Sequence, residues 1–306
     1  MGITTFEQLL ERAAVAGARR VAVVGADSPS ALAAVDAAAE RGLAIPVLVG
    51  DPLAIRARIA AGRLVRLREA EIVSASDHAA AAGVAAELAA RRRADILLKG
   101  SVRTDQVLRA VLDARHSLRT GRLLSDVLLY EDTLGADGKR LIAVTDGGIN
   151  VCPDAEALRQ IISNAIVVMQ ALGVERPKIG LLSATEAVTD SVPSSVVARQ
   201  LAAIAASGML GHCDVFGPLA LDNALLESAA RAKGIDSPVA GHVDVMVVPN
   251  IEAGNILGKA VKYLGGSITA HVVVGARVPV LIPSRVESAE DKLHSIALGV
   301  LLHAQP

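Results

Sequence analysis

Short apolar runs and amphipathic stretches alternate along most of this chain. The runs are rich in Val, Ile and Leu and shorter than a typical helix, so they predict buried strands. The strands predicted in this way cover residues 21–24, 45–49, 95–98, 178–183, 214–216, 244–248, 268–274 and 278–282.

Between these strands, apolar positions recur at the 3, 4, 7, 8 spacing of one helix face. Ser28 and Asp51 each precede a proline, and either Ser76 or Asp77 is a good N-cap, so helices are expected to begin there. The alternation of strand and helix predicts an α/β fold built on a parallel sheet. The predicted helices cover residues 4–16, 31–41, 52–62, 77–93, 153–172, 193–207 and 289–301.

The strand–helix order is interrupted once, in the middle of the chain. Apolar stretches at 123–131 and 141–145 are separated by Asp137-Gly138, a turn sequence typical of β-hairpins. Antiparallel pairing at this point predicts a change of domain nearby. The length of 306 residues is also long for one hydrophobic core and suits two domains.

The composition narrows the class of protein. Hydrophobic residues make up 52% of the chain, but they are mainly Ala, Val, Leu and Ile. The scarcity of aromatic side chains argues against the stacking surfaces that bind single-stranded nucleic acids. A net charge of −1 likewise gives no electrostatic case for nucleic acid or an anionic membrane. The aromatic residues are Phe6, Tyr130, Phe216 and Tyr263.

The two cysteines, Cys152 and Cys213, form no CxxC pair. Two isolated cysteines are most simply free thiols, which predicts a cytoplasmic protein. The N-terminal stretch lacks the basic and apolar regions of a signal peptide, and no apolar run is long enough to span a membrane.

A candidate anion site lies near the end of the chain. The apolar run 278–282 ends at Pro283 and is followed by Ser284-Arg285, and Ser288 with Asp291 has the spacing of a capping box. A strand end that leads into a helix presents free N–H groups to an anion, and Arg285 adds a charge. The alternative is that Ser288 and Asp291 only cap the helix while Arg285 is an ordinary solvated charge.

A second candidate is the stretch Lys99-Gly-Ser-Val-Arg-Thr104, which follows a predicted strand and precedes a helix. Ligands bind at such positions in open α/β sheets. Arg109, Arg119 and Arg122 follow closely, so the region favours anion binding over a merely solvated basic face. The sequence contains no G-x-G-x-x-G, no Gly-x-Ser-x-Gly and no zinc-type spacing of its seven histidines.

Taken together in chain order, six motifs resemble the phosphate acetyltransferase/phosphate butyryltransferase family, and the resemblance covers nearly the whole chain. The motifs are Lys99–Asp105 with Val107-Leu-Arg109, Thr145-Asp-Gly-Gly-Ile-Asn150, Gly217-Pro-Leu-Ala-Leu-Asp222, Ser237-Pro-Val-Ala-Gly241, Pro249-Asn-Ile-Glu-Ala-Gly-Asn255 and Ser284-Arg285 with Asp291.

The resemblance implies two α/β domains around a cleft, like those of the isocitrate/isopropylmalate dehydrogenases, with the second domain inserted in the first. Domain I would hold residues 1–122 and 275–306, and domain II residues 123–274. The chain is more similar to the shorter, butyryltransferase-like branch, because no regulatory extension precedes Val21. The implied reaction transfers an acyl group between coenzyme A and inorganic phosphate, with coenzyme A as a substrate and no metal or other cofactor. Homodimers are usual in this family.

The resemblance also assigns site residues. It implies catalytic roles for Ser284, Arg285 and Asp291, and a phosphate-binding role for Arg109. The chain departs from the acetyltransferase branch at Val286-Glu287, where that branch has glycine and a small residue. A further family arginine stays open between Arg63, Arg66 and Arg103. The other expected substrate-binding residues are Lys99, Ser101, Arg103, Asn150 and Asn255.

Two other functions stay open at this stage. A metal-dependent hydroxyacid dehydrogenase would share the fold, but it needs clustered carboxylates and a nicotinamide site, and no motif supports either. A non-catalytic acyl-CoA sensor on the same scaffold would bind coenzyme A but would show no phosphate-dependent release of free thiol. Fold alone does not decide between them.

Overall fold

The computed structural model describes residues 2–134 and 138–304. The chain divides into two compact units. The split unit consists of Glu7–Arg122 and Ala270–Pro306, and the inserted unit consists of Met1–Phe6 and Leu123–Thr269. Both units have a mixed α/β fold, in which helices cover a sheet.

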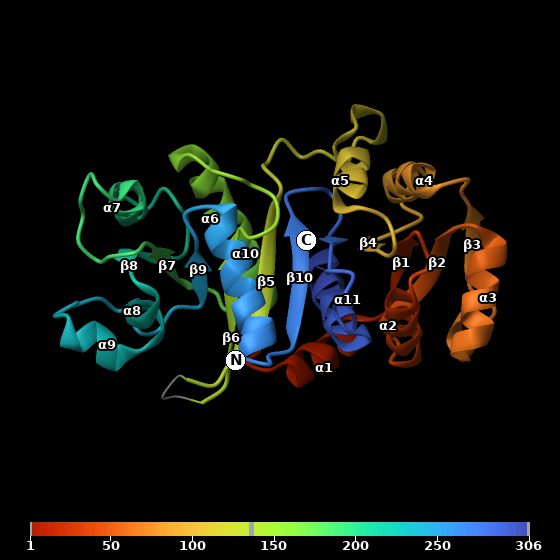
Figure 1. Ribbon diagram of the computed structural model, residues 1–306, viewed down its shortest axis with the longest axis horizontal. Coiled ribbons are helices and arrows are strands. Elements are labelled where there is room, and N and C mark those ends of the chain that lie inside the picture. The colour runs from red at the N-terminus through yellow and green to blue at the C-terminus, as the bar shows by residue number, and fades with distance from the viewer. Residues whose placement is uncertain (1, 135–137, 305–306) are drawn as a thin grey trace. The chain divides into compact units, whose positions relative to one another are not determined.

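The sheet of the split unit has the strand order β3-β2-β1-β4-β11-β10 (Figure 1). All of its neighbouring strands run parallel except β10 and β11, which are antiparallel. The strands are β1 (Arg19–Val24), β2 (Ala44–Gly50), β3 (Glu71–Ser74), β4 (Ile96–Lys99), β10 (Thr269–Val274) and β11 (Val280–Leu281).

Helices cover both faces of this sheet, which explains why β1 and β4 are buried on both sides. Figure 1 shows α4 and α5 over one face and α2, α3 and α11 over the other. The helices are α1 (Phe6–Ala16), α2 (Pro29–Glu40), α3 (Pro52–Gly62), α4 (His78–Ala90), α5 (Thr104–Leu112) and α11 (Ala289–His303), with short 3₁₀ turns η1 (Val65–Leu67) and η2 (Ala114–His116).

The order of connections makes the loops after β1 and β4 neighbours. From β1 the chain moves to β2 and β3 on one side, and β4 then pairs with β1 on its other side. The two loops are bonded directly, since the Gly100 N–H donates to Val24 O (2.8 Å) and the Ser101 N–H to Gly25 O (3.0 Å). A Cβ on Gly100 would lie 2.1 Å from Gly25 O, so this approach requires glycine.

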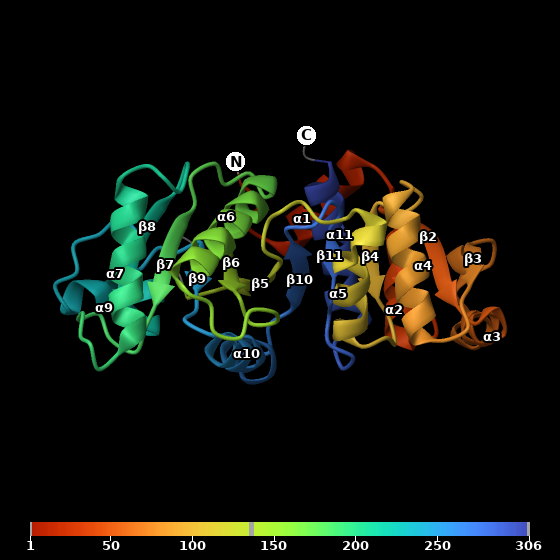
Figure 2. The ribbon, with the colours of Figure 1, turned by 90° about the horizontal axis from the view of Figure 1, so that it is seen from above.

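The inserted unit has the strand order β5-β6-β9-β7-β8. Figure 2 shows α6 and α7 side by side over this sheet, and α8, α9 and α10 share a separate core cluster with it. The elements are β5 (Ser125–Asp132), β6 (Arg140–Thr145), α6 (Ala155–Ala171), β7 (Lys178–Leu182), α7 (Pro193–Ala206), β8 (Asp214–Leu219), α8 (Leu221–Leu225), α9 (Glu227–Ala232), β9 (Val245–Val247), α10 (Ile251–Lys259) and the π-helical turn η3 (Ala260–Leu264).

The predicted α/β class and hairpin strands are confirmed, since β5 and β6 pair antiparallel (Leu128 with Val144). Asp137 of the predicted hairpin turn lies outside the described residues. The strand predicted at 278–282 shortens to β11, and β3 was not predicted. Ser28 precedes α2 as expected, but its side chain makes no capping hydrogen bond.

The inserted unit ends at Thr269 and includes Met1–Phe6. The ranges expected for domains I and II stay predictions. Within the split unit β10 pairs with β11, through Val273 and Val280. None of the helices in residues 2–134 and 138–304 combines the length and apolar character that crossing a bilayer requires.

Candidate functional site

The Ser284–Asp291 segment covers the turn after β11 and the first residues of α11. Its predicted capping box is present, because the Ser288 N–H and O–H both donate to Asp291 Oδ2 (3.0 and 2.5 Å) and the Asp291 N–H donates to Ser288 Oγ (3.1 Å). Asp291 is fully buried, whereas Ser284 is half-buried and Arg285 is exposed. The capping interpretation of Ser288 and Asp291 is therefore correct, and any chemical role of Asp291 must coexist with it.

Lys292 holds this turn against the helix, and sequence reasoning missed it. Its side chain is only 2% exposed, and Nζ donates to Ser284 O (3.1 Å) and to Glu287 O (2.6 Å). A signal was available, since Lys292 lies four residues before Ile296, on the buried stripe of α11. A lysine at an inward position of a helix needs polar partners, and here the main chain of the candidate site provides them.

Arg285 joins the two candidate anion stretches. Its Nη2 donates to Ser101 O (3.2 Å), although the two residues are 184 positions apart in the sequence. They meet because β4 and β11 are parallel neighbours, with Leu97 beside Val280, and both loops leave the same edge of the sheet. The structure therefore brings together Ser284-Arg285 and the loop that begins at Lys99.

Lys99 lies at the centre of an excess of positive charge. It is 4% exposed, and burial, followed by repulsion from Arg285 and Lys292, lowers the pKa of its amine to about 8. The carboxylate of Glu287 acts in the opposite direction and raises this pKa. Cations that repel one another in a partly desolvated space are stabilised by a multiply charged anion such as phosphate.

Glu287 belongs to the pair Val286-Glu287, at which the chain is expected to differ from the acetyltransferase branch, and it is buried beside these cations. Its Oε1 lies 3.4 Å from His271 Nε2. Its Oε2 is buried and accepts no hydrogen bond within residues 2–134 and 138–304. The carboxylate therefore partly neutralises the cations around Lys99.

Arg103 and Arg109 lie beyond this cluster, at the start and in the last turn of α5. Both guanidinium groups are exposed and pair with Asp105, from Arg103 Nε to Oδ1 (2.9 Å) and from Arg109 Nη2 to Oδ2 (3.5 Å). The structure thus groups Lys99, Ser101 and Arg285 closely, while these two arginines are turned toward Asp105. Exposed pairs of this kind are weak and can exchange for a ligand.

The predicted residues of the inserted unit lie on the loop after β6 and on α10, which pack together. Asp146 begins the loop after β6, and its carboxylate accepts from the Gly148 and Ile149 N–H groups (2.8 and 2.9 Å) and from Asn150 Nδ2 (2.6 Å). Asn150 Nδ2 also donates to Leu124 O (2.9 Å). Burial, followed by the neighbouring Asp126, raises the pKa of Asp146 to about 6. Asn150 therefore braces its own loop.

Asn255 lies in α10, and its Nδ2 donates to Gly147 O (3.3 Å). Gly147 and Gly254 approach so closely that a Cβ on Gly147 would lie 2.8 Å from Gly254 C. The loop after β6 and the first turns of α10 are consequently held together. The side-chain amides of Asn150 and Asn255 both donate to main-chain oxygens. Both residues therefore support the loop after β6.

Comparison with known proteins adds independent findings. The family model described as Phosphate acetyl/butaryl transferase matches residues 77–300. The chain is 40% identical to a phosphate acetyltransferase of Rhizobium meliloti over 268 residues, covering 88% of this chain and 84% of the relative. It is 37% identical to a probable phosphate butyryltransferase of Bacillus subtilis (strain 168) over 294 residues, covering 96% of each.

Solved structures agree with these relatives. A branched-chain phosphotransacylase from Enterococcus faecalis V583 superposes with a TM-score of 0.80 at 32% identity, covering 93% of this chain and 99% of that one. A phosphotransacetylase from Streptococcus pyogenes gives a TM-score of 0.81 at 20% identity, covering 98% and 99%, and shows likeness of fold alone.

Proposed function

Because the chain belongs to the phosphate acetyltransferase/phosphate butyryltransferase family, we propose that it transfers a short acyl group reversibly between coenzyme A and inorganic phosphate. The observation in the structure that carries this proposal is that Arg285, which follows β11, hydrogen-bonds to the loop after β4, and that Arg285 and Lys292 lie near enough to Lys99 to lower the pKa of its amine. Cations brought together in this way are suited to a phosphate or acyl phosphate.

In the proposed site, Arg285 and Lys99 bind the phosphoryl group, and Arg109 exchanges Asp105 for the same ligand. Ser284 donates a hydrogen bond to the oxyanion that develops on the acyl carbonyl. Lys292 positions Ser284 by holding its carbonyl oxygen. Positioning and charge stabilisation of this kind supply most of the rate in such a reaction.

Asp291 is the proposed base toward the coenzyme A thiol in the thioester-forming direction. A thiol of pKa about 8.5 is only a few per cent thiolate at pH 7, so proton removal contributes at most about 30-fold. The thiolate attacks the acyl carbonyl carbon. The bond between this carbon and the phosphate oxygen then breaks, and the released phosphate is bound by the cations. In reverse, phosphate attacks the thioester and the thiolate recovers its proton from Asp291.

The measurement that tests this function is phosphate-dependent release of free thiol from an acyl-CoA series of increasing chain length. The proposed enzyme releases coenzyme A only when phosphate is present, and the best substrate identifies the acyl group. Neighbouring chain lengths differ by about 1–3 kcal/mol per methylene in a fitted pocket. Binding of acyl-CoA without release would instead indicate the sensor, and reduction of a nicotinamide would indicate the dehydrogenase.

The same assay tests the arginines. We expect Arg285→Ala and Arg109→Ala each to lower kcat/KM by about 100-fold, as the loss of a preorganised charge does. Arg115→Ala is the matched control, because Arg115 is an exposed arginine of the split unit paired with Asp113. If either test variant turns over as fast as the wild type, the arginine that it lacks has no role in the reaction.

Several expectations that follow from the family stay predictions. They are a homodimer, a cytoplasmic location, chemistry without a metal or other cofactor, substrate contacts by Ser101, Arg103, Asn150 and Asn255, and the dehydrogenase-like two-domain architecture.

A further inference from the structure

Lys99 combines a buried side chain with an amine that lacks a hydrogen-bond acceptor. The side chain is 4% exposed, and its Nζ makes no hydrogen bond to residues 2–134 and 138–304. Lys292 is buried as well, but its Nζ donates to the main-chain oxygens of Ser284 and Glu287. A buried ammonium group is costly unless it is paired, so the environment of Lys99 favours its neutral amine.

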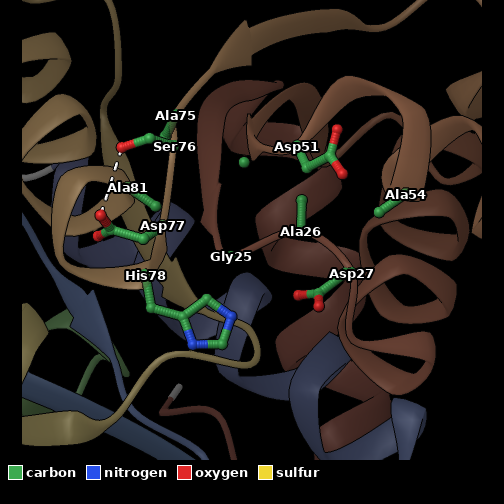
Figure 3. A pocket seen from close by; sticks show the side chains of 11 residues that line it. Gly25, Ala26, Asp27, Asp51, Ala54, Ala75, Ser76, Asp77, His78 and Ala81 are labelled. Atoms are coloured by element: carbon green, nitrogen blue, oxygen red, sulfur yellow. Dashed lines mark hydrogen bonds between the residues drawn. The ribbon is translucent and has the colours of Figure 1, made fainter.

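The main chain around Lys99 is fixed on both sides. Lys99 ends β4, where it pairs with Val24 of β1. Two residues later, the Ser101 side chain is hydrogen-bonded to Asp27 Oδ1 and to His78 Nε2 (3.2 Å for the latter). Asp27 and His78 face one another at the small pocket formed by the loops after β1, β2 and β3 (Figure 3). The loop that follows Lys99 is therefore anchored, which keeps the amine beside the cations of the candidate site.

Charged groups on several neighbouring elements act on the Lys99 amine. Burial, followed by repulsion from Arg285 and Lys292, lowers its pKa to about 8. Glu287 acts in the opposite direction and lies beside His271 of β10 (Oε1 to Nε2, 3.4 Å). At pH 7 about a tenth of such amines are uncharged, compared with about one in a few thousand for an ordinary lysine. An uncharged lysine amine is a nucleophile, so Lys99 can react at neutral pH.

The proposed function brings an activated acyl group to the same amine. In that proposal the phosphoryl group of an acyl phosphate binds to Lys99 and Arg285, and the acyl carbon is joined to the phosphorus through a single oxygen atom. A side chain that contacts the phosphoryl group therefore lies close to the carbonyl carbon as well. Holding a nucleophile beside its target in this way can raise a reaction rate by several orders of magnitude.

We propose that Lys99 is a site of self-acylation, modified by the acyl phosphate that is bound beside it. The inference rests on the proposed function, because that function brings acyl phosphate to this site. The uncharged amine attacks the acyl carbonyl carbon and forms an amide. The bond between this carbon and the phosphate oxygen breaks, phosphate leaves with the electron pair, and the nitrogen gives up one proton to the departing phosphate.

Acylation of Lys99 is expected to inactivate the site. An acylated lysine carries no charge, so the site loses one of the cations that would hold phosphate. Coenzyme A competes with the amine for the acyl group, because its thiolate attacks the same carbon. The modification is therefore expected to accumulate when acyl phosphate is present without coenzyme A, and to lower the activity in proportion.

Incubation of the wild-type chain with acetyl phosphate or butyryl phosphate, without coenzyme A, tests the proposal. Peptide mass spectrometry measures the acylation of each lysine at pH 7. We expect Lys99 to be acylated at least about tenfold faster than Lys259, an exposed lysine of α10 that serves as the internal reference. The rate at Lys99 should level off as the concentration of acyl phosphate rises, and inorganic phosphate should suppress it.

Two variants separate charge from reactivity. Lys99→Arg keeps a cation but has no amine to acylate, so its remaining activity should resist acyl phosphate, whereas wild-type activity falls as the Lys99 adduct forms. Glu287→Gln removes the carboxylate that raises the pKa of Lys99, so acylation of Lys99 at pH 7 should become faster. Lys259→Arg is the matched control and should be inactivated like the wild type. Thermal melting confirms that each variant is folded.

Failure of this inference can be told apart from failure of the proposed function. Equal acylation of Lys99 and Lys259, or a rate that rises linearly with acyl phosphate, would mean chance acylation and overturn the inference. Phosphate-dependent thiol release without a Lys99 adduct would also overturn it and leave the proposed function intact. If no thiol is released but Lys99 is acylated in a saturable manner, the proposed function fails and the modification site stands.

Discussion

At the residue scale, Lys99 shows how much of a site the sequence can indicate. Its place after a predicted strand was sufficient to propose it as part of an anion-binding loop. Its burial and its low pKa depend on Arg285 and Lys292, which are distant in sequence and reach it only because β11 pairs with β4. Lys292 itself was missed for the same reason, since its partners are main-chain oxygens of a turn.

Phosphate binding is predicted to weaken above pH 8 because of Lys99. The amine is charged below its pKa of about 8 and neutral above it, so a cation is lost as the pH rises. If this cation is needed, KM for phosphate increases by up to about tenfold per pH unit in this range. Initial rates at saturating acyl-CoA between pH 7 and pH 9.5 measure the effect. Lys99→Arg keeps its charge and should show a flatter profile; an equally steep one would exclude Lys99 as the titrating group.

At the element scale, the first turn of α11 has the capping role that was considered for it, and the catalytic role of Asp291 stays a proposal. The sequence was sufficient to predict the capping box of Ser288 and Asp291, because capping is local and depends on spacing. It could not show that Asp291 is fully buried or that Lys292 holds the preceding turn. Stability and catalysis can therefore be separated here only by experiment.

Asp291→Asn makes this separation. Asparagine retains an oxygen for the Ser288 N–H, so the free energy of unfolding should fall by about 1 kcal/mol or less. If Asp291 is the base, kcat falls about 30-fold in the folded variant. Ser288→Ala is the companion variant, which weakens the cap and leaves the carboxylate in place. Full activity in a destabilised Asp291→Asn would leave capping as its only role.

The Asp146 loop of the inserted unit predicts a pH effect on stability. The pKa of Asp146 is raised to about 6 in the folded protein, mainly by burial. Between pH 4 and pH 6 the folded state therefore binds a proton that the unfolded state has lost. The contribution of this group to stability is greatest below pH 4 and falls by about 3 kcal/mol as the pH rises to 6.

Asp146→Asn removes this titration. The melting temperature of the wild type relative to Asp146→Asn should fall as the pH is raised from 4 to 6, measured by circular dichroism. Asp190→Asn, an exposed carboxylate of the same unit, is the control and should follow the wild type. A constant difference between wild type and Asp146→Asn would show that Asp146 is ionised throughout.

At the scale of the whole molecule, periodicity and caps were sufficient to predict the α/β class and the order of most elements. The exceptions have physical reasons. β3 is short and only half-buried, so its hydrophobic pattern is weak. The pocket formed by the loops after β1, β2 and β3 depends on segments that meet only in the folded sheet.

Because the split unit is made of two separate chain segments, it can be completed only late in synthesis. β11 pairs with both β4 and β10, but the ribosome makes residues 123–269 before it reaches either β10 or β11. The nascent chain must therefore keep the exposed edge of β4 unpaired while the inserted unit is translated, although domains generally fold in the order of synthesis. Ser284 and Arg285 join Lys99 only after that delay, so a ribosome stalled in the inserted unit would carry a chain in which the proposed phosphate site is incomplete.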